Sequence, residues 1–412
     1  MKTIIGIDWS ESKHCVHIYN EAGSLLTRLE IPHSLEGFAQ LRRRIAAINS
    51  EPSNCLIAIE TSHNLLVDYL ARCGYTLYIL VPSVVKSNRG RQGSSGAKDD
   101  DRDAQLLGDI LRTDRGRLIP WQADGPLVRQ MRSLLSWVDD LTAAIIAQHN
   151  RLRANLLRYY PQPLVAFSSL TGQLALHFLI TYAAPADLEG LTLAQLTAFC
   201  RQHRYYQWAR LPTMLANLLT PAPQLDEEVV PAYRQQTVFL AQQLLSLSQQ
   251  KKEAIAQINQ LFDQHPDGPI FASLPGAGEL LAPKLLVMFG DHRSRYPHRA
   301  ILPAIAGTCP VTVASGRSRY VKFRRACNHH FRQTAQQFAQ ASTRQSVWAA
   351  TYFSQACCRG HSKSHAYRCL ANRWLHLIWT LWQTHQLYDE DYHLRQVARH
   401  RRPERGLTSA HR

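Results

Sequence analysis

Residues 3–8 have the sequence TIIGID, an apolar run that ends on a carboxylate. Two segments in which polar and apolar residues alternate follow it, HCVHIYN over residues 14–20 and SLLTRLEI over residues 24–31. Alternation with a period of two is typical of β-strands that bury one face. We therefore predict a three-stranded meander over residues 3–31.

Helical and strand patterns alternate after this meander. Residues 34–48 and 65–72 have helical periodicity, whereas the apolar runs CLIAIE (55–60) and TLYILV (76–81) are typical of buried strands. Strands that alternate with helices indicate a mixed α/β sheet for the N-terminal part of the chain.

From about residue 125 onward the pattern is almost entirely helical. Between residues 236 and 262, apolar residues keep a 4-3 spacing, which indicates either a coiled-coil arm or a long amphipathic helix packed within its own domain. The sequence HPDGP (265–269) then interrupts the helices and marks a boundary. The predicted fold class is α/β plus all-α, with domains over residues 1–122, 123–265 and 266–412, the last of them mainly helical and basic.

The composition favours a polyanionic partner. Among 412 residues, 47 are Lys or Arg and 31 are Asp or Glu, so the formal net charge is +16 and the surface should attract nucleic acid. A basic enzyme without a polymer ligand is the alternative that charge alone leaves open. Nine Cys without a CxxC pair or zinc-ligand spacing indicate a reducing cytoplasm and no zinc. No segment is long and apolar enough to predict insertion into a membrane.

Acidic residues stand where three of the predicted elements begin or end. Asp8 ends the first strand and Glu60 ends the strand CLIAIE, so both carboxylates emerge at one edge if these strands are neighbours. A helix opens further on, and on it Asp103 shares a face with either Asp99 or Asp100. Clustered carboxylates need cations to offset their repulsion, and hard oxygen ligands select Mg²⁺ or Mn²⁺. Taken singly, each acid is more typical of a helix cap, a helix-dipole partner or a solvated strand end.

The combined acidic pattern is more specific than its parts: GIDWS (6–10), IAIE (57–60) and KDDDRDA (98–104) occur in this order. In these motifs the chain resembles the RuvC-like, RNase H-fold catalytic domain of a family of insertion-sequence transposases with a DEDD acidic tetrad, which act as RNA-guided recombinases. The family pattern K-x-D-x-x-D-A falls on Lys98, Asp100, Asp103 and Ala104, and it selects Asp100 over Asp99. The catalytic and metal-binding residues that the resemblance implies, with Mg²⁺ or Mn²⁺ as cofactor, are Asp8, Glu60, Asp100 and Asp103.

A glycine-rich turn opens the third predicted domain. The sequence LPGAG (274–278) precedes a helical pattern over residues 279–289, and it resembles the turn of a helix-hairpin-helix. In that turn, backbone N–H groups and a helix N-terminus bind a phosphate, which makes Gly276 and Gly278 candidate nucleic-acid contacts. An ordinary connector between helices explains the turn about equally well.

A serine beside a flexible glycine lies among basic residues farther along. Charge that develops on a phosphoryl group near Ser315 would be stabilised by these guanidinium and ammonium groups. From this segment alone, a loop that only binds phosphate is the preferred interpretation. The same transposase family has a Ser-Gly pair, basic residues and an Arg-x-Cys-Asn stretch in its C-terminal domain, so the resemblance implies that Ser315 is the nucleophile, with Ser318 as second choice. The predicted nucleic-acid contacts of this segment are Gly316, Arg317, Arg319, Lys322, Arg324 and Arg325.

The C-terminal region mixes basic residues with tryptophans. Lys363 and Arg368 are predicted phosphate contacts, as is the basic tail beyond residue 394. Trp374, Trp379 and Trp382 are predicted to lie in the core.

The resemblance implies a site-specific DNA recombinase that cuts and rejoins strands through a covalent phosphoserine. The expected partners are double-stranded target and donor DNA, a structured non-coding guide (bridge) RNA that supplies sequence by base pairing, and further copies of the chain in a tetramer built as a dimer of dimers. The acids and the serine would meet on one phosphorus atom, in cis or in trans. The expected location is the cytoplasm of a prokaryote, at the nucleoid when the protein is active.

Two other functions stay open from the sequence. The first is a RuvC-like, metal-dependent DNA nuclease that uses water, in which Ser315 only grips phosphate. The second is a basic RNA-binding scaffold in which the carboxylates never assemble.

Overall fold

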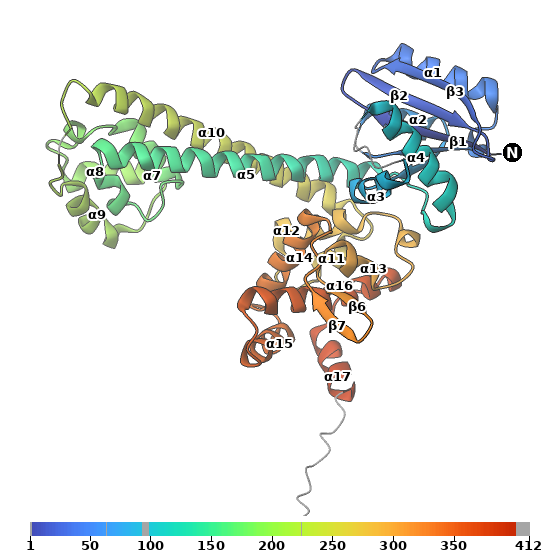
Figure 1. Ribbon diagram of the computed structural model, residues 1–412. Helices are drawn as coiled ribbons and strands as arrows, with labels where there is room; N and C mark the ends of the chain where they lie inside the picture. Colours follow the sequence, from blue (N-terminus) through green and yellow to red (C-terminus); the bar gives the residue numbers. More distant parts are fainter. Residues whose placement is uncertain (1, 63, 93–98, 224, 401–412) are drawn as a thin grey trace, which may run out of the picture. The chain divides into compact units, whose positions relative to one another are not determined.

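A computed structural model describes residues 2–62, 64–92, 99–223 and 225–400 of the chain (Figure 1). Lys98 of the predicted acidic motif and the tail beyond residue 400 lie outside the described residues.

The chain forms two compact units. Unit 1 comprises Met1–Gly125 with Asp291–His329, and unit 2 comprises Pro126–Gly290 with His330–Arg412. The segment 291–329, which carries Ser315, therefore groups with the N-terminal residues, whereas the predicted division placed it with the rest of residues 266–412. The three-domain division stays a prediction.

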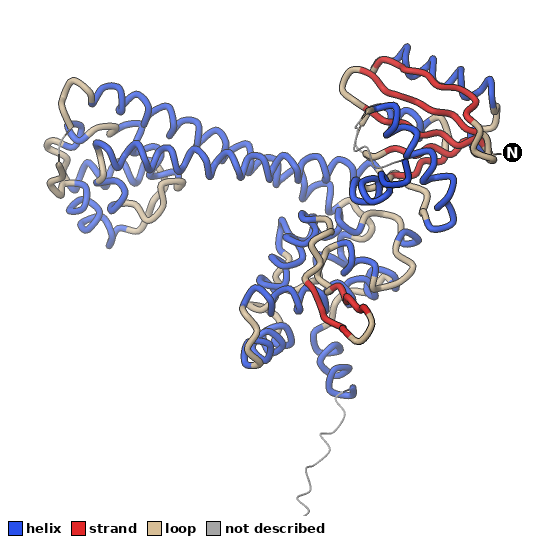
Figure 2. The backbone as a smooth tube through the Cα atoms, viewed as in Figure 1, coloured by secondary structure: helices blue, strands red, loops and turns tan. Residues whose placement is uncertain are grey.

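A five-stranded mixed sheet lies in unit 1 (Figure 2). Its strands are β1 (Thr3–Trp9), β2 (Lys13–Tyr19), β3 (Leu25–Pro32), β4 (Cys55–Ile59) and β5 (Thr76–Ile79). The order is β3-β2-β1-β4-β5, with antiparallel pairs from β1 to β3 and parallel pairs from β1 through β4 to β5. The predicted meander and the mixed α/β sheet are confirmed.

Helices cover both faces of this sheet because the strands are apolar on both sides. The helices are α1 (Leu35–Ile48) and α2 (Leu65–Arg72) on one face, and α3 (Pro82–Asn88) and α4 (Asp100–Asp114) on the other. Ile5 and Ile7 of β1 pack with α1 and α2, whereas Ile4 packs with α4. Helix α4 lies so close to β1 that a Cβ atom on Gly6 would come within 2.0 Å of the carbonyl oxygen of Ala104. Glycine at this position is what allows α4 to lie directly on the strand.

A second part of unit 1 is tied to the end of the N-terminal segment. Buried Asp124 accepts hydrogen bonds from the backbone N–H of Asp291 at 3.2 Å and from Arg295 at 3.1 Å. Beyond this junction lie α13 (Ile301–Ile305) and a hairpin of β6 (Val311–Ser315) and β7 (Ser318–Lys322). The prediction of a mainly helical third region missed this hairpin.

Two long helices dominate unit 2, α5 (Pro126–Tyr159) and α10 (Val230–Asp263), which run side by side in Figure 1. Leu240, Leu244 and Ile258 of the 4-3 pattern are buried. The apolar seam of α10 therefore packs on α5 of the same chain, which favours the second of the two interpretations, a long helix packed within its own domain.

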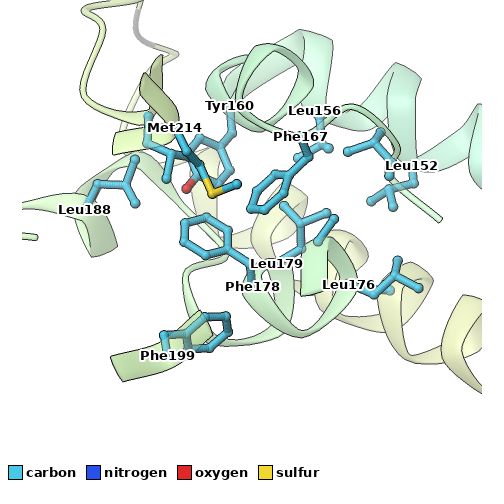
Figure 3. Packing of buried hydrophobic residues seen from close by; sticks show 14 of the residues in the cluster. Leu152, Leu156, Tyr160, Phe167, Leu176, Phe178, Leu179, Leu188, Phe199 and Met214 are labelled. Atoms are coloured by element: carbon cyan, nitrogen blue, oxygen red, sulfur yellow. The ribbon is translucent and has the colours of Figure 1, made fainter. Parts of the chain in front are cut away.

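Four short helices close over one end of this pair. They are α6 (Gln162–Ala166), α7 (Gln173–Thr181), α8 (Leu193–Gln202) and α9 (Leu211–Leu218). Their apolar side chains form one core with the ends of α5 and α10, in which Phe178 lies among Leu179, Phe199 and Met214 (Figure 3). This core makes residues 160–220 a folded helical element rather than a linker.

The rest of unit 2 is helical and has a tryptophan-rich core. Its helices are α11 (Gly268–Ala272), α12 (Gly278–Phe289), α14 (His329–Ser342), α15 (Val347–Cys358), α16 (Lys363–Thr384) and α17 (Glu390–His400). Trp374 and Trp382 are fully buried, as predicted, and the Trp382 Nε1 donates to Asp267 at 2.9 Å. Trp379 is only half-buried. No helix within the described ranges has the length and apolar character needed to cross a membrane.

Candidate active site

Asp8 and Glu60 stand next to each other at the carboxyl ends of two adjacent parallel strands. β1 and β4 pair with Ile7 opposite Ile59, and in each strand the next residue is the carboxylate. Side chains alternate along a strand, which puts Asp8 on the same face as Gly6, the face that α4 covers. Both carboxylates are half-buried. The two strands are therefore neighbours, which is the condition under which both carboxylates emerge at one edge.

Helix α4 brings its first turn to this edge of the sheet. Ala104 packs against Gly6, and one turn earlier Asp101 lies 3.6 Å from the Cys15 sulfur. Cys15 is the β2 partner of Asp8. The helix therefore runs antiparallel to β1, and its N-terminus lies at the strand end that carries Asp8.

The three consecutive aspartates at the start of α4 differ in what they contact. Asp99 is the N-cap, and its carboxylate accepts a hydrogen bond from the N–H of Asp101 at 3.3 Å. Asp100 is exposed in the first turn. Asp99 thus serves as the cap, and no three of the predicted acids Asp8, Glu60, Asp100 and Asp103, all within the described ranges, have carboxylate oxygens within 4.8 Å of one another.

Asp103 is buried, with 9% of its surface exposed. Its Oδ2 lies 2.9 Å from Nη2 of Arg89, which is half-exposed. The guanidinium supplies the positive charge that a buried carboxylate requires. Arg89 was not among the residues predicted from the sequence, because a pair between two separate helical segments 14 residues apart leaves no periodic pattern.

Asp101 ties α4 to the meander. Its Oδ1 lies 2.6 Å from His17 Nε2 on β2 and 2.6 Å from Arg28 Nε on β3. Burial by itself would raise the pKa of Asp101, but the hydrogen bond and charge of His17, with the charge of Arg28, hold it below its ordinary value. His17 and Arg28 were not among the residues predicted from the sequence, although Cys15, His17 and Tyr19 alternate onto the face of β2 that α4 covers.

Cys15, His17 and Asp101 offer atoms within 4.8 Å of one another, close enough to share a metal ion. Burial, and next the charge of Asp101, raises the pKa of the Cys15 thiol to about 11, so the thiol is protonated at neutral pH. Arg28 already neutralises the carboxylate. We therefore interpret Asp101, His17 and Arg28 as an ion-pair cluster that fixes the position of α4 on the sheet.

Ser315 and Ser318 are opposite each other at the end of the β6–β7 hairpin. Gly316 and Arg317 form the two-residue turn between them, and Gly316 has a φ of 55°. This is the left-handed conformation that a type II′ turn has at its first central position, where glycine is strongly preferred. Residues directly opposite in a hairpin share a face, with Cβ atoms about 4.5–5.5 Å apart. The structure therefore places both candidate nucleophiles at one exposed point.

The basic residues of the hairpin divide between its two faces. Lys322 shares the face of Ser315, and its Nζ lies 4.9 Å from the ring centroid of Tyr320. Arg319 pairs opposite Ala314 and lies on the other face. Along the hairpin, Arg317 and Arg319 are therefore the basic residues nearest to Ser315, whereas Lys322 shares its face but lies four residues beyond Ser318.

The glycines of the LPGAG turn have different surroundings. Gly276 has a φ of 80°, and a Cβ atom there would lie 2.8 Å from the backbone of Ala341. Its N–H donates to Gln345 Oε1 at 2.8 Å. Gly278, with a φ of 55°, begins α12 and has open space beside its Cα. Close packing against Ala341 thus explains why residue 276 is a glycine. The backbone of Gly278 has no such neighbour and is accessible to a ligand.

The remaining predicted contacts lie in both units. Arg317, Arg319, Lys322 and Arg325 are exposed and Arg324 is half-buried, all in unit 1 with the four acids. In unit 2, Lys363 is exposed at the first position of α16 and Arg368 is half-buried on the same helix.

Comparison with known proteins identifies relatives along nearly the whole chain. A family model described as a transposase, of the DEDD type of IS110, matches residues 5–161, and one described as "Transposase IS116/IS110/IS902 family" matches residues 268–354. The mini-circle putative transposase for IS117 of Streptomyces coelicolor is 32% identical over 393 residues, 93% of this chain and 95% of the relative. An uncharacterized 43.6 kDa protein of insertion element IS110 from the same organism is 25% identical over 395 residues, with the same two shares. The first model spans the four predicted acids Asp8, Glu60, Asp100 and Asp103, and the second spans Ser315.

Proposed function

Because the chain belongs to the IS116/IS110/IS902 family of transposases, we propose that it is a site-specific DNA recombinase of an insertion sequence, guided by a structured non-coding RNA. Transposases cut and rejoin DNA strands, so the protein is an enzyme that acts on DNA. The observation that supports the finer proposal is that β1 and β4, at whose ends Asp8 and Glu60 stand, are adjacent parallel strands, with the first turn of α4 beside Cys15, the β2 partner of Asp8.

The strand order β3-β2-β1-β4-β5, with α4 across β1, supports a RuvC-like, RNase H-like fold for the N-terminal domain over residues 1–122. In this assignment the ends of β1 and β4 carry the first two acids of a DEDD tetrad, and α4 carries the other two.

Asp8, Glu60, Asp100 and Asp103 would hold Mg²⁺ or Mn²⁺. The donor set suits hard cations, because it consists of carboxylate oxygens from three segments. A metal ion bound there would share Asp103 with the guanidinium of Arg89 or displace it, because the two groups lie 2.9 Å apart. A divalent ion bound there would offset charge on the scissile phosphate and lower the pKa of an attacking hydroxyl.

Ser315 would supply the nucleophile. Its Oγ forms a bond to phosphorus while the bond from phosphorus to one sugar oxygen breaks, and the freed sugar oxygen takes up a proton. The phosphoserine link conserves the bond energy, so a second sugar hydroxyl can rejoin the strand by the reverse reaction. The turn end of the β6–β7 hairpin suits this role because it is exposed, so Ser315 could contact a DNA duplex without any change in the buried core of the protein.

The basic surface would hold the nucleic acids. Base pairing by the guide RNA supplies sequence, while the protein contacts backbone and shape, as in other RNA-guided effectors. The contacts proposed in unit 1 are Gly316, Arg317, Arg319, Lys322, Arg324 and Arg325, and in unit 2 they are Gly276, Gly278, Lys363 and Arg368. Target and donor duplexes are the DNA substrates.

Strand exchange between two duplexes requires four cuts, for which we propose a tetramer assembled as a dimer of dimers. The acids of one protomer would then meet the serine of another, so that assembly controls cleavage. Since α5 covers the apolar seam of α10, an arm that joins protomers would use a different face of these helices.

The decisive experiment tests for the covalent intermediate. The protein is incubated with Mg²⁺, donor and target duplexes, and RNA transcribed from the non-coding flanks of its reading frame, and the mixture is then denatured. We expect a protein–DNA adduct that Ser315→Ala loses and that requires both RNA and divalent ion.

Two other outcomes would each replace the proposal. Free cut ends without an adduct, unchanged in Ser315→Ala, would identify a metal-dependent nuclease that uses water. Tight RNA binding without any cut, at every RNA and metal composition, would identify a scaffold.

A further inference from the structure

The segment 201–210, which runs from the last residues of α8 through a loop to the 3-10 helix η5 (Trp208–Arg210), is rich in arginine and aromatic residues; we call it the loop Arg201–Arg210. Residues 201–210 have the sequence RQHRYYQWAR, and no acidic residue occurs between residues 190 and 225. Tyr206 is 64% exposed and Trp208 is 40% exposed. The exposed arginines of the loop are Arg201, Arg204 and Arg210. Two large aromatic side chains thus meet solvent in a positively charged neighbourhood.

The loop is anchored in the helical core at both ends. Phe199 and Cys200 are buried just before it, and Leu211 and Met214 are buried just after it. Phe199 and Met214 appear in the core of Figure 3. Tyr205 also packs against this core. Tyr205 therefore points into the core while its neighbour Tyr206 points into solvent. The backbone that carries the exposed aromatic residues is held in place by this packing.

Arg204 adopts a conformation that normally favours glycine. Its φ is 56°, one of two positive values at non-glycine positions among the described residues. The N–H of Arg204 donates to Arg201 O, and that of Tyr205 donates to Cys200 O, the two bonds of a Schellman motif. Glycine would satisfy this turn without strain, whereas arginine adds a guanidinium at its apex. The conformation of the turn does not require an arginine at this position. Binding of a negatively charged ligand would explain why arginine stands here instead of glycine.

The exposed rings do not stack on each other. Tyr206 and Trp208 meet edge to face, with centroids 5.8 Å apart and planes at 82°. The guanidinium carbon of Arg201 lies 5.8 Å from the Trp208 ring centroid. Neither ring is stacked flat on the other, and Arg201 lies over Trp208, so the pair combines unstacked aromatic surface with a cation that suits a phosphate.

We propose that the loop Arg201–Arg210 is a binding site for unpaired nucleotides, whose bases stack on Tyr206 and Trp208 while Arg201 and Arg204 contact the phosphates. Base stacking on aromatic side chains with cationic residues alongside is the usual physical basis for binding single strands. A continuous duplex has no free base faces to offer, so the ligand is a loop, bulge or displaced strand. The inference goes beyond the proposed function and is independent of it, because binding here involves neither the acids nor Ser315.

The test is photo-crosslinking of the full chain to unstructured oligonucleotides. Oligo(U) RNA and oligo(dT) DNA of about 12 nucleotides, a length within the site sizes of single-strand binders, carry 4-thiouracil or 4-thiothymine. Crosslinked peptides are mapped by mass spectrometry, because other basic surfaces will also hold the probe. We expect crosslinks within residues 201–210, and the comparison of the two probes decides whether RNA or DNA is preferred.

Two variants separate binding from folding. Tyr206→Ala with Trp208→Ala should lower the crosslink yield at this loop by roughly fivefold or more for each lost ring. Arg204→Gly gives the turn its preferred residue, so we expect the yield to fall while the Tm is unchanged or higher. Phe239→Ala, at an exposed ring of α10, and Arg43→Ala, on α1, are controls that should leave the mapped yield unchanged.

The proposal is overturned if crosslinks never map to residues 201–210, or if neither variant lowers their yield. It is also overturned if the double variant changes the oligomeric state, measured by light scattering, while the crosslink yield persists. That result would identify the aromatics as a contact between protein chains.

Discussion

Ser315 and Ser318 form a cross-strand pair, separated along the chain only by the turn residues Gly316 and Arg317. Both hydroxyls lie on one face of the hairpin and both are exposed. The two serines therefore have nearly the same exposure and orientation in the structure, and the preference for Ser315 as nucleophile comes from the family pattern.

Paired substitutions should distinguish these serines. We expect Ser315→Ala to lower the yield of covalent protein–DNA adduct by about 100-fold or more, because no other group forms the bond. Ser318→Ala, a matched loss of a hydroxyl one strand away, should retain the adduct within about threefold. Denaturing gels of labelled DNA measure the yield, and mass spectrometry locates the modified residue. Adduct at residue 318 would reassign the nucleophile.

Replacing Gly6 should push α4 away from the sheet. A Cβ atom there would lie 2.0 Å from Ala104 O and 2.6 Å from the backbone nitrogen of Gly108. We expect Gly6→Ala to lower the free energy of unfolding by about 1–3 kcal/mol, as overpacking does, and to reduce cleavage because Asp103 moves with the helix. Urea titrations measure the stability. Gly116→Ala, with no atom within 4 Å, is the control and should be nearly neutral. Equal stability of both variants would contradict the close packing.

Single substitutions in α4 should distinguish the proposed catalytic role of Asp103 from the helix-capping role of Asp99. We expect Asp103→Asn to bind nucleic acid within about threefold of wild type but to cleave at least about 100-fold more slowly. Asp99→Asn is the matched control, because asparagine caps helices as well as aspartate does. Gel shifts measure binding and strand-cleavage assays measure rate. If Asp103→Asn lost binding as well, the acid would be structural.

The carboxylate of Glu390 should stabilise unit 2 in a pH-dependent way. It accepts hydrogen bonds from Ser346 Oγ, from the Trp348 N–H and from the Tyr388 hydroxyl. Burial by itself would raise the pKa of Glu390, but these donors hold it below its ordinary value of 4.5. A lowered folded-state pKa means that the stabilisation is complete above the unfolded-state pKa and is lost as the pH falls through the folded-state pKa.

Glu390→Gln should therefore lower the free energy of unfolding by about 1–3 kcal/mol at pH 7, and the difference from wild type should shrink below about pH 4. Urea unfolding at a series of pH values measures this. Glu279→Gln, at an exposed position in the first turn of α12, is the control and should change the free energy of unfolding at pH 7 by less than about 0.5 kcal/mol. A constant difference at all pH values would show that the substitution acts through packing and not through charge.

Local pattern was sufficient for much of the N-terminal part of the chain. The helix predicted over residues 65–72 has those bounds, and β1 and β4 end within one residue of Asp8 and Glu60, the predicted strand ends. The hairpin over residues 311–322 was missed, although Val311 and Val313 flank a threonine and a two-residue glycine turn follows. Its strands are short and exposed, so the apolar pattern that identifies a buried strand is weak there.

The amino-acid sequence by itself determined which segments become strands and helices and where carboxylates can emerge, because periodicity depends on residues close together in the chain. Only the tertiary structure decided which aspartate of α4 caps the helix, that Asp101 pairs with Arg28 and Asp103 with Arg89, and that α10 packs on α5. These choices depend on register and packing between distant segments, where a shift of one residue would move each charged group to a different partner.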